Sequence, residues 1–406
     1  MYVWSNNASI SQSVLLFRRC FAISLLSSLP SIFRFPPFNI SIYIHIAKLN
    51  RLKIANFCDK NIIMEKWKKE YVKSIRDTDN LPDYFSELNF REIRQVAEKY
   101  PFFANRYYVE LASKHPEIKS VIIPDKRELE DEKGLEDPLG EERDSPVPGI
   151  VHRYPDRVLF LVHNVCPIHC RYCTRKRILG KKVNFGRHTW DKCIEYIKNH
   201  KEIFDVLISG GDPLLLNNSD LKYLIENLKK IKHVGLIRIG TRVPSAFPIR
   251  IDNDLITLLS NFLPIYINIH FVHPAEITRE VENACLSLSG AGIILGAQIV
   301  LLKGINDDPG ILKVLLKKLL NIGVKPYAIF HPDNTKGTSH FRLDIEKGIS
   351  IIHSLRGYIS GMAIPHYMVD LYPGGGKVEI CYNYIKSRKG DTYGIENYKG
   401  ELFEYR

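Results

Sequence analysis

Short apolar runs alternate with longer amphipathic segments along the chain from Arg157 onward. Each run is bounded by Gly, Pro or polar residues, as expected of strands buried in a parallel sheet. We predict six strands: Val158–His163, Asp205–Ser209, Gly235–Ile239, Ile265–Phe271, Leu295–Leu302 and Pro326–His331. Six strand–helix units in succession predict an α/β fold, a partial parallel (β/α)6 TIM-like barrel.

Two of the intervening helices have clear start or stop signals. Ser219 is predicted to cap a helix that opens with Asp220. Pro274 suits the first turn of another helix, which is expected to run to about Ser289 and to end at Gly290. In such barrels the chemistry lies at the carboxyl ends of the strands.

The part of the chain before the barrel has a different pattern. Residues 64–150 indicate a helical N-terminal region with a linker, and helices are predicted over Glu65–Ile75 and Phe90–Lys99. The stretch Asp125–Arg143 is dense in charge and is predicted to be a solvated linker. We assign residues 151–386 to the barrel domain and residues 387–406 to a short C-terminal tail.

Residues 1–63 differ in composition from everything that follows. Residues 1–58 contain no Asp or Glu, and two arginines precede the apolar stretch Cys20–Phe33. This pattern fits an organellar transit peptide or, less well, a secretory signal, but the stretch is too short for a membrane span. We favour a spurious extension, with translation starting at Met64, and keep a targeting segment as the alternative.

Charge and cysteine content limit the classes of function. The 406 residues carry a net charge of +12, but residues 1–63 contribute +6 through seven Lys and Arg against one Asp, so the remainder carries +6. This modest excess does not indicate the clustered basic face of a nucleic-acid-binding protein. The eight cysteines suggest no disulfide framework, which favours a reducing cytoplasm.

Three of the cysteines stand together, as Cys166, Cys170 and Cys173 in the run CPIHCRYCTRKR. Their C-x3-C-x2-C spacing supplies three thiolates, whereas structural zinc sites and typical electron-transfer clusters take four ligands. The triplet therefore predicts a four-iron cluster with one iron open for chemistry. A zinc knuckle completed by His163 or His169 is the alternative on spacing alone.

Longer motifs surround the triplet. In order, the chain contains HRYPDRVLFLVHNVCPIHCRYCTRKR, DVLISGGDPLL, LIRIGTRVP, YINIHFVHPAEIT, QIVLLKGIND, HPDNTKGTSHFR, LRGYISGMAIPHYMVD and PGGGK. From about Trp67 to about Tyr384 it thereby resembles the lysine 2,3-aminomutase family of radical SAM enzymes. The resemblance implies an isomerase that converts L-lysine to β-lysine by a 1,2-amino shift. It also implies a 4Fe-4S cluster on the triplet, S-adenosyl-L-methionine (SAM) and pyridoxal 5′-phosphate (PLP).

For SAM, the resemblance points to residues at the ends of three predicted strands: Ser209, Gly210, Gly211, Asp212, Arg242 and His270. The Ser-Gly-Gly-Asp run would offer backbone groups and a carboxylate to the methionyl amino group, because glycine lets the backbone approach closely. Outside this context, a plain turn is the simpler interpretation of the run.

For PLP, the resemblance points to Lys377, which follows three glycines. A P-loop interpretation of this run fails, because Val378 stands where that motif needs Ser or Thr. In the family the lysine of this loop carries PLP. The resemblance further assigns Arg153 and Arg157 to the phosphate, whose geometry suits the planar fork of arginine, and places Gln298 near the cofactor.

For the substrate, the resemblance assigns the carboxylate to Arg175 and the distal ammonium of lysine to Asp333 and Asp370. A terminal cation that leaves water needs compensating carboxylates, and a glutamate-specific relative should lack this acidic pair. The alternatives are β-lysine formation for the modification of elongation factor P, another amino acid substrate, and, in a different class, an iron–sulfur protein that binds RNA.

The expected partners are the small-molecule amino acid and an electron donor such as flavodoxin or ferredoxin, and a homo-oligomer stays open. We expect no nucleic acid and no membrane. No zinc is predicted, because no cysteine follows Cys381 and Asp308 stands where the long members of the family have their other zinc cysteine.

Overall fold

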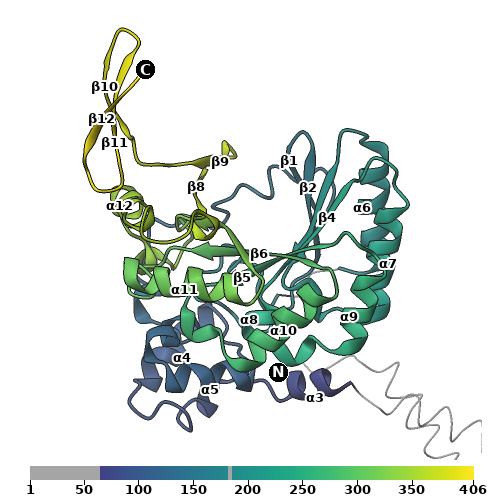
Figure 1. Cartoon of the computed structure of the whole chain (residues 1–406). Coiled ribbons are helices and arrows are strands. Elements are labelled where there is room, and N and C mark those ends of the chain that lie inside the picture. Colours follow the sequence, from purple (N-terminus) through teal and green to yellow (C-terminus); the bar gives the residue numbers. More distant parts are fainter. Residues whose placement is uncertain (1–64, 182–184) are drawn as a thin grey trace, which may run out of the picture. The chain divides into compact units, whose positions relative to one another are not determined.

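A computed structural model describes residues 65–181 and 185–406, so the predicted extension 1–63 lies outside the described residues. Nine strands of the described chain form one sheet in sequence order (Figure 1). They are β1 Ile150–Tyr154, β2 Arg157–His163, β3 Asp205–Gly210, β4 Leu236–Thr241, β5 Tyr266–Phe271, β6 Ile294–Val300, β7 Lys325–Phe330, β8 His366–Leu371 and β9 Gly376–Glu379.

Strands β2 to β8 run parallel and form the wall of the barrel. Strands β1 and β9 pair antiparallel with the two ends of this wall. Each of the six predicted strands corresponds to one of β2 to β7, and the prediction of a partial parallel barrel is confirmed. Strand β8 is a seventh parallel strand that the apolar pattern did not predict.

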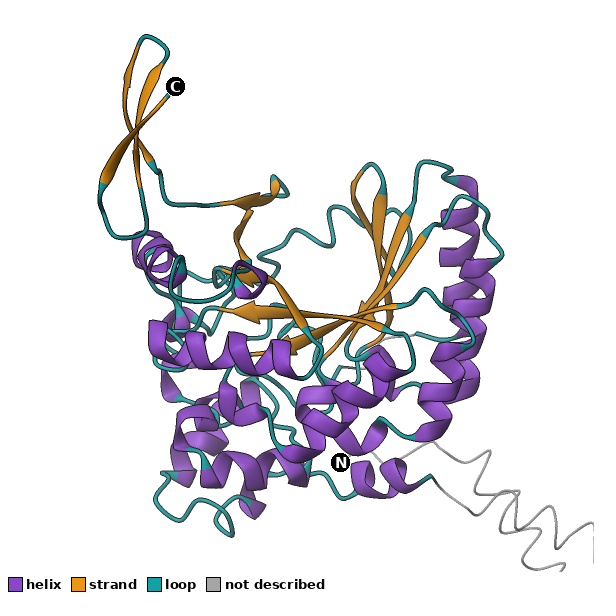
Figure 2. Ribbon diagram, viewed as in Figure 1, coloured by secondary structure: helices purple, strands orange, loops and turns teal. Residues whose placement is uncertain are grey.

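Helices follow the strands and cover the outer face of the sheet (Figures 1 and 2). Their apolar sides and the buried side chains of the sheet form the main core. The helices are α6 Arg187–Asn199, α7 Asn218–Lys229, α8 Val243–Ala246, α9 Asn253–Ser260, α10 Arg279–Gly290, α11 Pro309–Asn321 and α12 Ile345–Leu355.

Two helix starts differ from the prediction. Helix α7 begins at Asn218, so Ser219 lies inside its first turn and is not the cap. Pro274–Glu276 forms a separate 3₁₀ turn, and α10 starts only at Arg279. There Thr278 is the cap residue, because its hydroxyl accepts the N–H of the third helical residue. The predicted end of this helix at Gly290 is correct.

The region before the barrel is helical, as predicted. It contains α3 Lys66–Val72, α4 Phe90–Lys99 and α5 Arg106–Lys114. Its apolar residues form a second core, which also takes in Ile168 and Tyr172 from the cysteine loop. The helical region therefore supports the loop that carries the predicted cluster. Among the described helices, none has both the length and the apolar character to cross a membrane.

The chain after β9 forms a second sheet of three antiparallel strands (yellow in Figure 1). They are β10 Ile385–Lys389, β11 Thr392–Glu396 and β12 Leu402–Tyr405. The sequence analysis described most of this stretch only as a tail. Most of its side chains are exposed, so it lacks the apolar pattern that marks buried strands.

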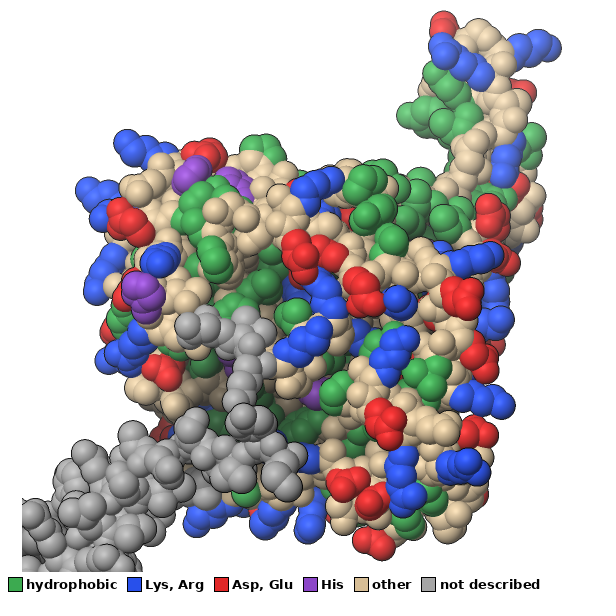
Figure 3. Space-filling model, turned by 180° about the vertical axis from the view of Figure 1, so that it is seen from behind, with side chains coloured by type: hydrophobic (Ala, Val, Ile, Leu, Met, Phe, Trp, Pro, Cys, Tyr) green, Lys and Arg blue, Asp and Glu red, His purple; other side chains and the backbone are tan. Residues whose placement is uncertain are grey.

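Charges of both signs are mixed on the molecular surface. On the face drawn in Figure 3, Lys and Arg lie among Asp and Glu over the described residues. A basic patch of the kind that tracks a nucleic-acid backbone would instead gather one sign on one face. This distribution agrees with the small net charge of the body of the chain.

Candidate active site

The cysteine loop follows β2 and is held by the N-terminal region. The Tyr71 hydroxyl donates to the carbonyl of Cys166 at 3.0 Å. His169 binds the Pro101 carbonyl through Nδ1 at 3.0 Å and the Phe103 carbonyl through its backbone N–H at 2.8 Å. These contacts hold the loop against the N-terminal region.

The three cysteines of the loop are partly buried. Burial raises the pKa of each thiol, that of Cys173 to about 11, and the charges of Cys170 and Cys173 raise the pKa of Cys166 further. Metal binding would overcome this penalty, because a metal-bound cysteine is a thiolate. In the described residues no three His, Cys, Asp or Glu side chains are grouped so that they could hold a metal ion. The three cysteines remain the predicted ligands on the basis of their spacing.

The zinc-knuckle alternative needs a histidine beside the thiols. Both candidate rings are engaged elsewhere: His163 Nε2 lies 2.7 Å from the carbonyl of Asp212, and His169 Nδ1 binds a backbone carbonyl as described above. The arrangement therefore favours three thiols without a histidine.

The Ser-Gly-Gly-Asp run ends β3 against the cysteine loop. Gly210 has φ +126°, and a Cβ there would lie 2.2 Å from the carbonyl oxygen of His163. A Cβ on Gly211 would lie 2.2 Å from the carbonyl oxygen of Val165. The two glycines are thus required by close packing of β3 on the loop, whereas the sequence analysis explained them by the approach of a ligand.

Asp212, the acid of this run, is buried and accepts three hydrogen bonds. Its carboxylate accepts the Thr241 hydroxyl and the Arg242 N–H, both at 2.6 Å, and the Leu214 N–H at 3.2 Å. Burial raises its pKa to about 6 despite these bonds. The side chain thereby joins the ends of β3 and β4, and Oδ2 accepts only one of these three bonds.

Arg242 and His270 meet in a buried polar cluster. Arg242 pairs with Glu276 at 2.6 Å and donates to the hydroxyls of Tyr108, at 3.1 Å, and Tyr172. The Tyr172 hydroxyl also lies 2.8 Å from His270 Nε2, and burial holds the pKa of this histidine well below its usual range. The structure thus brings the two predicted residues together through Tyr172, while Tyr108 and Glu276 hold Arg242; none of these three residues was predicted.

Lys377 lies opposite Asp370 in the hairpin of β8 and β9. The two residues are paired across the strands, which explains their seven-residue separation. Lys377 Nζ lies 2.5 Å from Asp370 Oδ2, and the Asp370 side chain is only 5% exposed. Gly374 and Gly376 have φ near +80°, so the turn between the strands depends on glycine. The predicted cofactor lysine and one predicted substrate aspartate are therefore in contact.

Arg153 and Arg157 have different surroundings. Arg153 pairs with Asp144 at 2.7 Å and with Asp370 at 3.0 Å. Arg157 is 44% exposed, lies over the Tyr154 ring and has only a long 3.7 Å pairing with a neighbouring acid. Arg153 therefore belongs to the group around Lys377, whereas Arg157 borders it with its guanidinium largely unengaged.

Gln298 lies on β6 in register with His270 on β5. Its side-chain oxygen accepts the Tyr327 hydroxyl at 3.2 Å. It therefore stands on the strand beside the buried cluster of Arg242, on the inner part of the barrel wall between the two predicted cofactor sites.

Asp333, the second predicted substrate aspartate, follows β7. Burial raises its pKa to about 7; the charge of Lys377 opposes this rise, and those of Asp370 and Glu141 add to it. Asp333 is therefore near enough to Lys377 and Asp370 for their charges to act on its carboxyl. Two carboxylates and one ammonium thus occupy the same region of the site.

Arg175, two residues after Cys173, has a buried partner that the sequence analysis missed. Glu141 accepts three hydrogen bonds from it at 2.6 to 3.0 Å, while Arg175 Nη1 donates to the Gly210 carbonyl at 3.2 Å. The Arg175 guanidinium holds the pKa of the Glu141 carboxyl below its usual range in spite of burial. Glu141 was hidden in a charged segment whose other members gave no reason to single it out.

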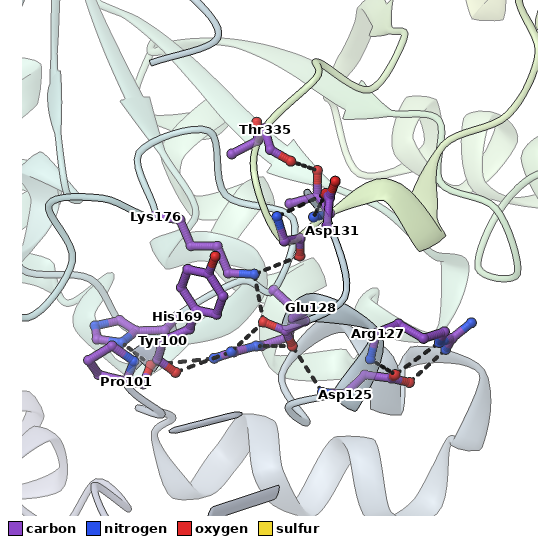
Figure 4. A network of polar contacts seen from close by, with 12 residues as sticks. Tyr100, Pro101, Asp125, Arg127, Glu128, Asp131, His169, Lys176 and Thr335 are labelled. Carbon is purple, nitrogen blue, oxygen red and sulfur yellow. Dashed lines mark hydrogen bonds and ion pairs between the residues drawn. The ribbon is translucent and has the colours of Figure 1, made fainter. Parts of the chain in front are cut away.

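The prediction that Asp125–Arg143 is a solvated linker is wrong. Three of its acids are buried: Glu128, Asp131 and Glu141. Figure 4 shows Glu128 and Asp131 inside a network of polar contacts that includes Lys176. The segment looked solvated because the cations that compensate its acids lie more than thirty residues further along the chain.

Two family models match parts of this chain. The family model described as "Radical SAM superfamily" matches residues 160–313, which include the cysteine loop and strands β3 to β6. The model described as "Lysine-2,3-aminomutase" matches residues 352–406. The chain is therefore a radical SAM enzyme, and membership of this superfamily implies a 4Fe-4S cluster and SAM.

Similar proteins of known name show which family within this superfamily the chain belongs to. The L-lysine 2,3-aminomutase of Methanococcus maripaludis is 41% identical over 87% of this chain and 85% of its own length. The enzyme of the same name from Clostridium subterminale is 39% identical over 84% and 83%. The chain belongs to the lysine 2,3-aminomutase family of isomerases, and the resemblance predicted from its motifs is confirmed.

The family includes more than one substrate. The glutamate 2,3-aminomutase of Clostridioides difficile is 38% identical over 87% of this chain and 85% of its own length. This value is close to those of the lysine enzymes, so overall identity does not decide the substrate. The decision depends on the side chains that face the substrate.

Proposed function

We propose that this amino-acid 2,3-aminomutase acts on L-lysine and forms β-lysine by moving the amino group from carbon 2 to carbon 3. The observation that supports lysine most directly is the ammonium of Lys377 on the buried carboxylate of Asp370, with Asp333 beside it. The distal ammonium of a lysine substrate has the same chemistry as the Lys377 ammonium. The side-chain carboxylate of glutamate would be repelled by the same two acids.

PLP is proposed to be held by Lys377, with Arg153 and Arg157 on its phosphate and Gln298 near its ring. The residues fit this group: Lys377 is partly exposed on a glycine-rich hairpin, and the Arg157 guanidinium is largely unengaged. When bound, the cluster with SAM supplies a radical, and PLP supplies a ring over which an unpaired electron can spread. The protein contributes the placement of these groups and the exclusion of competing reactions.

Arg175 is proposed to orient the substrate carboxylate. Its bidentate pairing with Glu141 fixes the plane of the guanidinium and leaves N–H groups on Nη1 and Nη2 for a second acceptor. Because Arg175 follows Cys173 by two residues, it links the position of the substrate to the loop that carries the cluster. The two ends of lysine would thus be held by opposite charges on different segments.

SAM is proposed to bind at the carboxyl ends of β3 to β5. Gly210 and Gly211 lie against the cysteine loop, Asp212 and Arg242 are buried, and His270 is partly buried. Arg242 Nε is buried without a hydrogen-bond partner in the described structure, which leaves a donor for a ligand. We also infer an electron donor of the flavodoxin or ferredoxin kind and a cytoplasmic location.

A turnover assay tests the proposal. Anaerobically reconstituted enzyme is incubated with SAM, a reductant and either lysine, glutamate or arginine, and the 3-amino product is quantified. We expect β-lysine as the main product, lost in Lys377→Ala together with the PLP absorbance of the protein. Lys399→Ala, an exposed lysine outside the site, is the control and should keep both. Preferred turnover of glutamate would refute the substrate assignment.

A further inference from the structure

The acidic segment before the barrel contacts two loops that belong to different parts of the site. Glu128, fully buried, accepts two hydrogen bonds from Arg171 at 2.6 and 2.9 Å and one from Lys176 Nζ at 2.6 Å. Arg171 lies between the second and third cluster cysteines, and Lys176 lies three residues after the third. Glu128 therefore holds both sides of the Cys173 turn.

Lys176 extends this network to the loop after β7. Its Nζ also donates to the carbonyl of Gly337 at 2.9 Å, so one ammonium joins Glu128 to the loop that begins with Asp333 (Figure 4). The same loop is bonded from its other side. Asp131 Oδ2 accepts the backbone N–H groups of Gly337, at 2.9 Å, and of Thr338 and Ser339, both at 3.1 Å.

The network is balanced in charge and shielded from water. Two buried carboxylates, Glu128 and Asp131, face two buried cations, Arg171 and Lys176. Hydrogen bonds to ionised groups are about twice as strong as neutral ones, and a buried member left unpaired is costly. Movement of the cysteine loop relative to the loop after β7 would break several such bonds together, so the two loops are held at a fixed separation.

We propose that Glu128, Asp131 and Lys176 are positioning residues that set the distance between the radical source at the cysteine triplet and the substrate ammonium at Asp333. The part that concerns the substrate rests on the proposed function. Reactions between positioned groups lose rate steeply when one group shifts by about 1 Å. The hydrogen bonds that connect these two loops therefore affect turnover, although none of the three residues touches the reacting atoms.

Lys176→Met tests this connection between the two loops with little risk to the fold. The variant removes the bonds of Lys176 to Glu128 and to Gly337 and leaves Glu128 in a one-to-one pair with Arg171. Hydrogen–deuterium exchange of the full-length protein reads the result at the backbone amides of Gly337, Thr338 and Ser339. We expect exchange about tenfold faster, as for the loss of one charge-assisted bond. Glu132→Gln, an exposed acid of the same segment, is the control and should leave exchange unchanged.

The second measurement concerns coupling. The reconstituted enzyme is incubated with lysine, and two products are quantified: 5′-deoxyadenosine that is not converted back to SAM, and β-lysine. The first amount is divided by the second. We expect this ratio to rise about tenfold or more in Lys176→Met and in Asp131→Asn. The electron paramagnetic resonance spectrum of the reduced cluster should stay unchanged, because its cysteines are intact. A purely structural role would lower folded yield and leave the ratio unchanged.

The outcomes separate the inference from the proposed function. If the wild type does not turn over lysine but the loop amides exchange faster in Lys176→Met, the connection between the loops is supported and the substrate assignment is refuted. If lysine is turned over and both variants keep the wild-type ratio and exchange rates, the inference is overturned.

Discussion

The burial of Asp333 predicts that lysine binding depends on pH around neutrality. Its pKa is raised to about 7, so the carboxyl is largely neutral below pH 7 and ionised above it. Only the ionised form attracts the distal ammonium of lysine, which stays charged over this range because its pKa is about 10.4. Affinity for lysine should therefore be present above pH 7 and should be lost as the pH falls through 7.

The size of the change in affinity follows from the fraction of Asp333 that is ionised at each pH. With a pKa of about 7, roughly one carboxyl in eleven is ionised at pH 6 and roughly ten in eleven at pH 8. The affinity for lysine should rise about tenfold between these values, or about 1.4 kcal/mol. Asp333→Asn cannot ionise, so this dependence on pH should disappear in the variant.

Calorimetric titration of the reconstituted enzyme, without reductant, measures the affinity. L-Norleucine is the reference ligand, because it shares the backbone of lysine and lacks the distal ammonium. The ratio of the two affinities removes the pH dependence of every group that contacts the shared part. A lysine-to-norleucine ratio that is flat from pH 6 to pH 8 in the wild type, or equally steep in Asp333→Asn, would refute the reasoning.

Two further predictions concern residues that hold others in place. Glu141→Gln keeps the shape of the side chain but weakens its hydrogen bonds to Arg175. Lysine and norleucine should therefore both bind about tenfold more weakly in the same titrations. A loss of affinity confined to lysine would contradict the role given to Arg175. Gly210→Ala places a Cβ 2.2 Å from the carbonyl oxygen of His163 at φ +126° and should cost about 2 kcal/mol or more, seen as a lower unfolding temperature and reduced iron content. In Gly240→Ala the nearest atom is 3.5 Å away, so this control should unfold and bind iron like the wild type; equal behaviour of the two variants would argue against the packing explanation.

The barrel wall was predictable because its strands are apolar on both faces. Strands β2 to β7 lie between helices and the barrel interior, so their sequences read as short continuous apolar runs. Strand β1 carries His152 and Arg153 within five residues, and β8 and β9 carry Asp370 and Lys377. These three strands were missed because polar and charged side chains interrupt the apolar run by which a buried strand is recognised.

The candidate site was predictable where a residue matches a family motif. Lys377 and Asp370 are in contact, and Arg242 and His270 share one hydrogen-bonded cluster. The supporting residues could not be predicted, because their role depends on partners that are distant in sequence. Glu128 lies 43 residues before Arg171 and 48 before Lys176, and no local pattern records such a pairing.

The two ends of the sheet meet through side chains. Arg153 and Tyr154 at the β1 end contact Asp370 and Lys377 of the β8–β9 hairpin, by an ion pair at 3.0 Å and a hydrogen bond at 2.7 Å. A backbone ladder would fix these strands in register, and a slip of one residue would turn every side chain to the opposite face. A seam made of side chains has no such register to preserve. Single substitutions in this seam can therefore change the surroundings of Lys377 without disturbing the hydrogen-bonded parallel wall or the cysteine loop that follows β2.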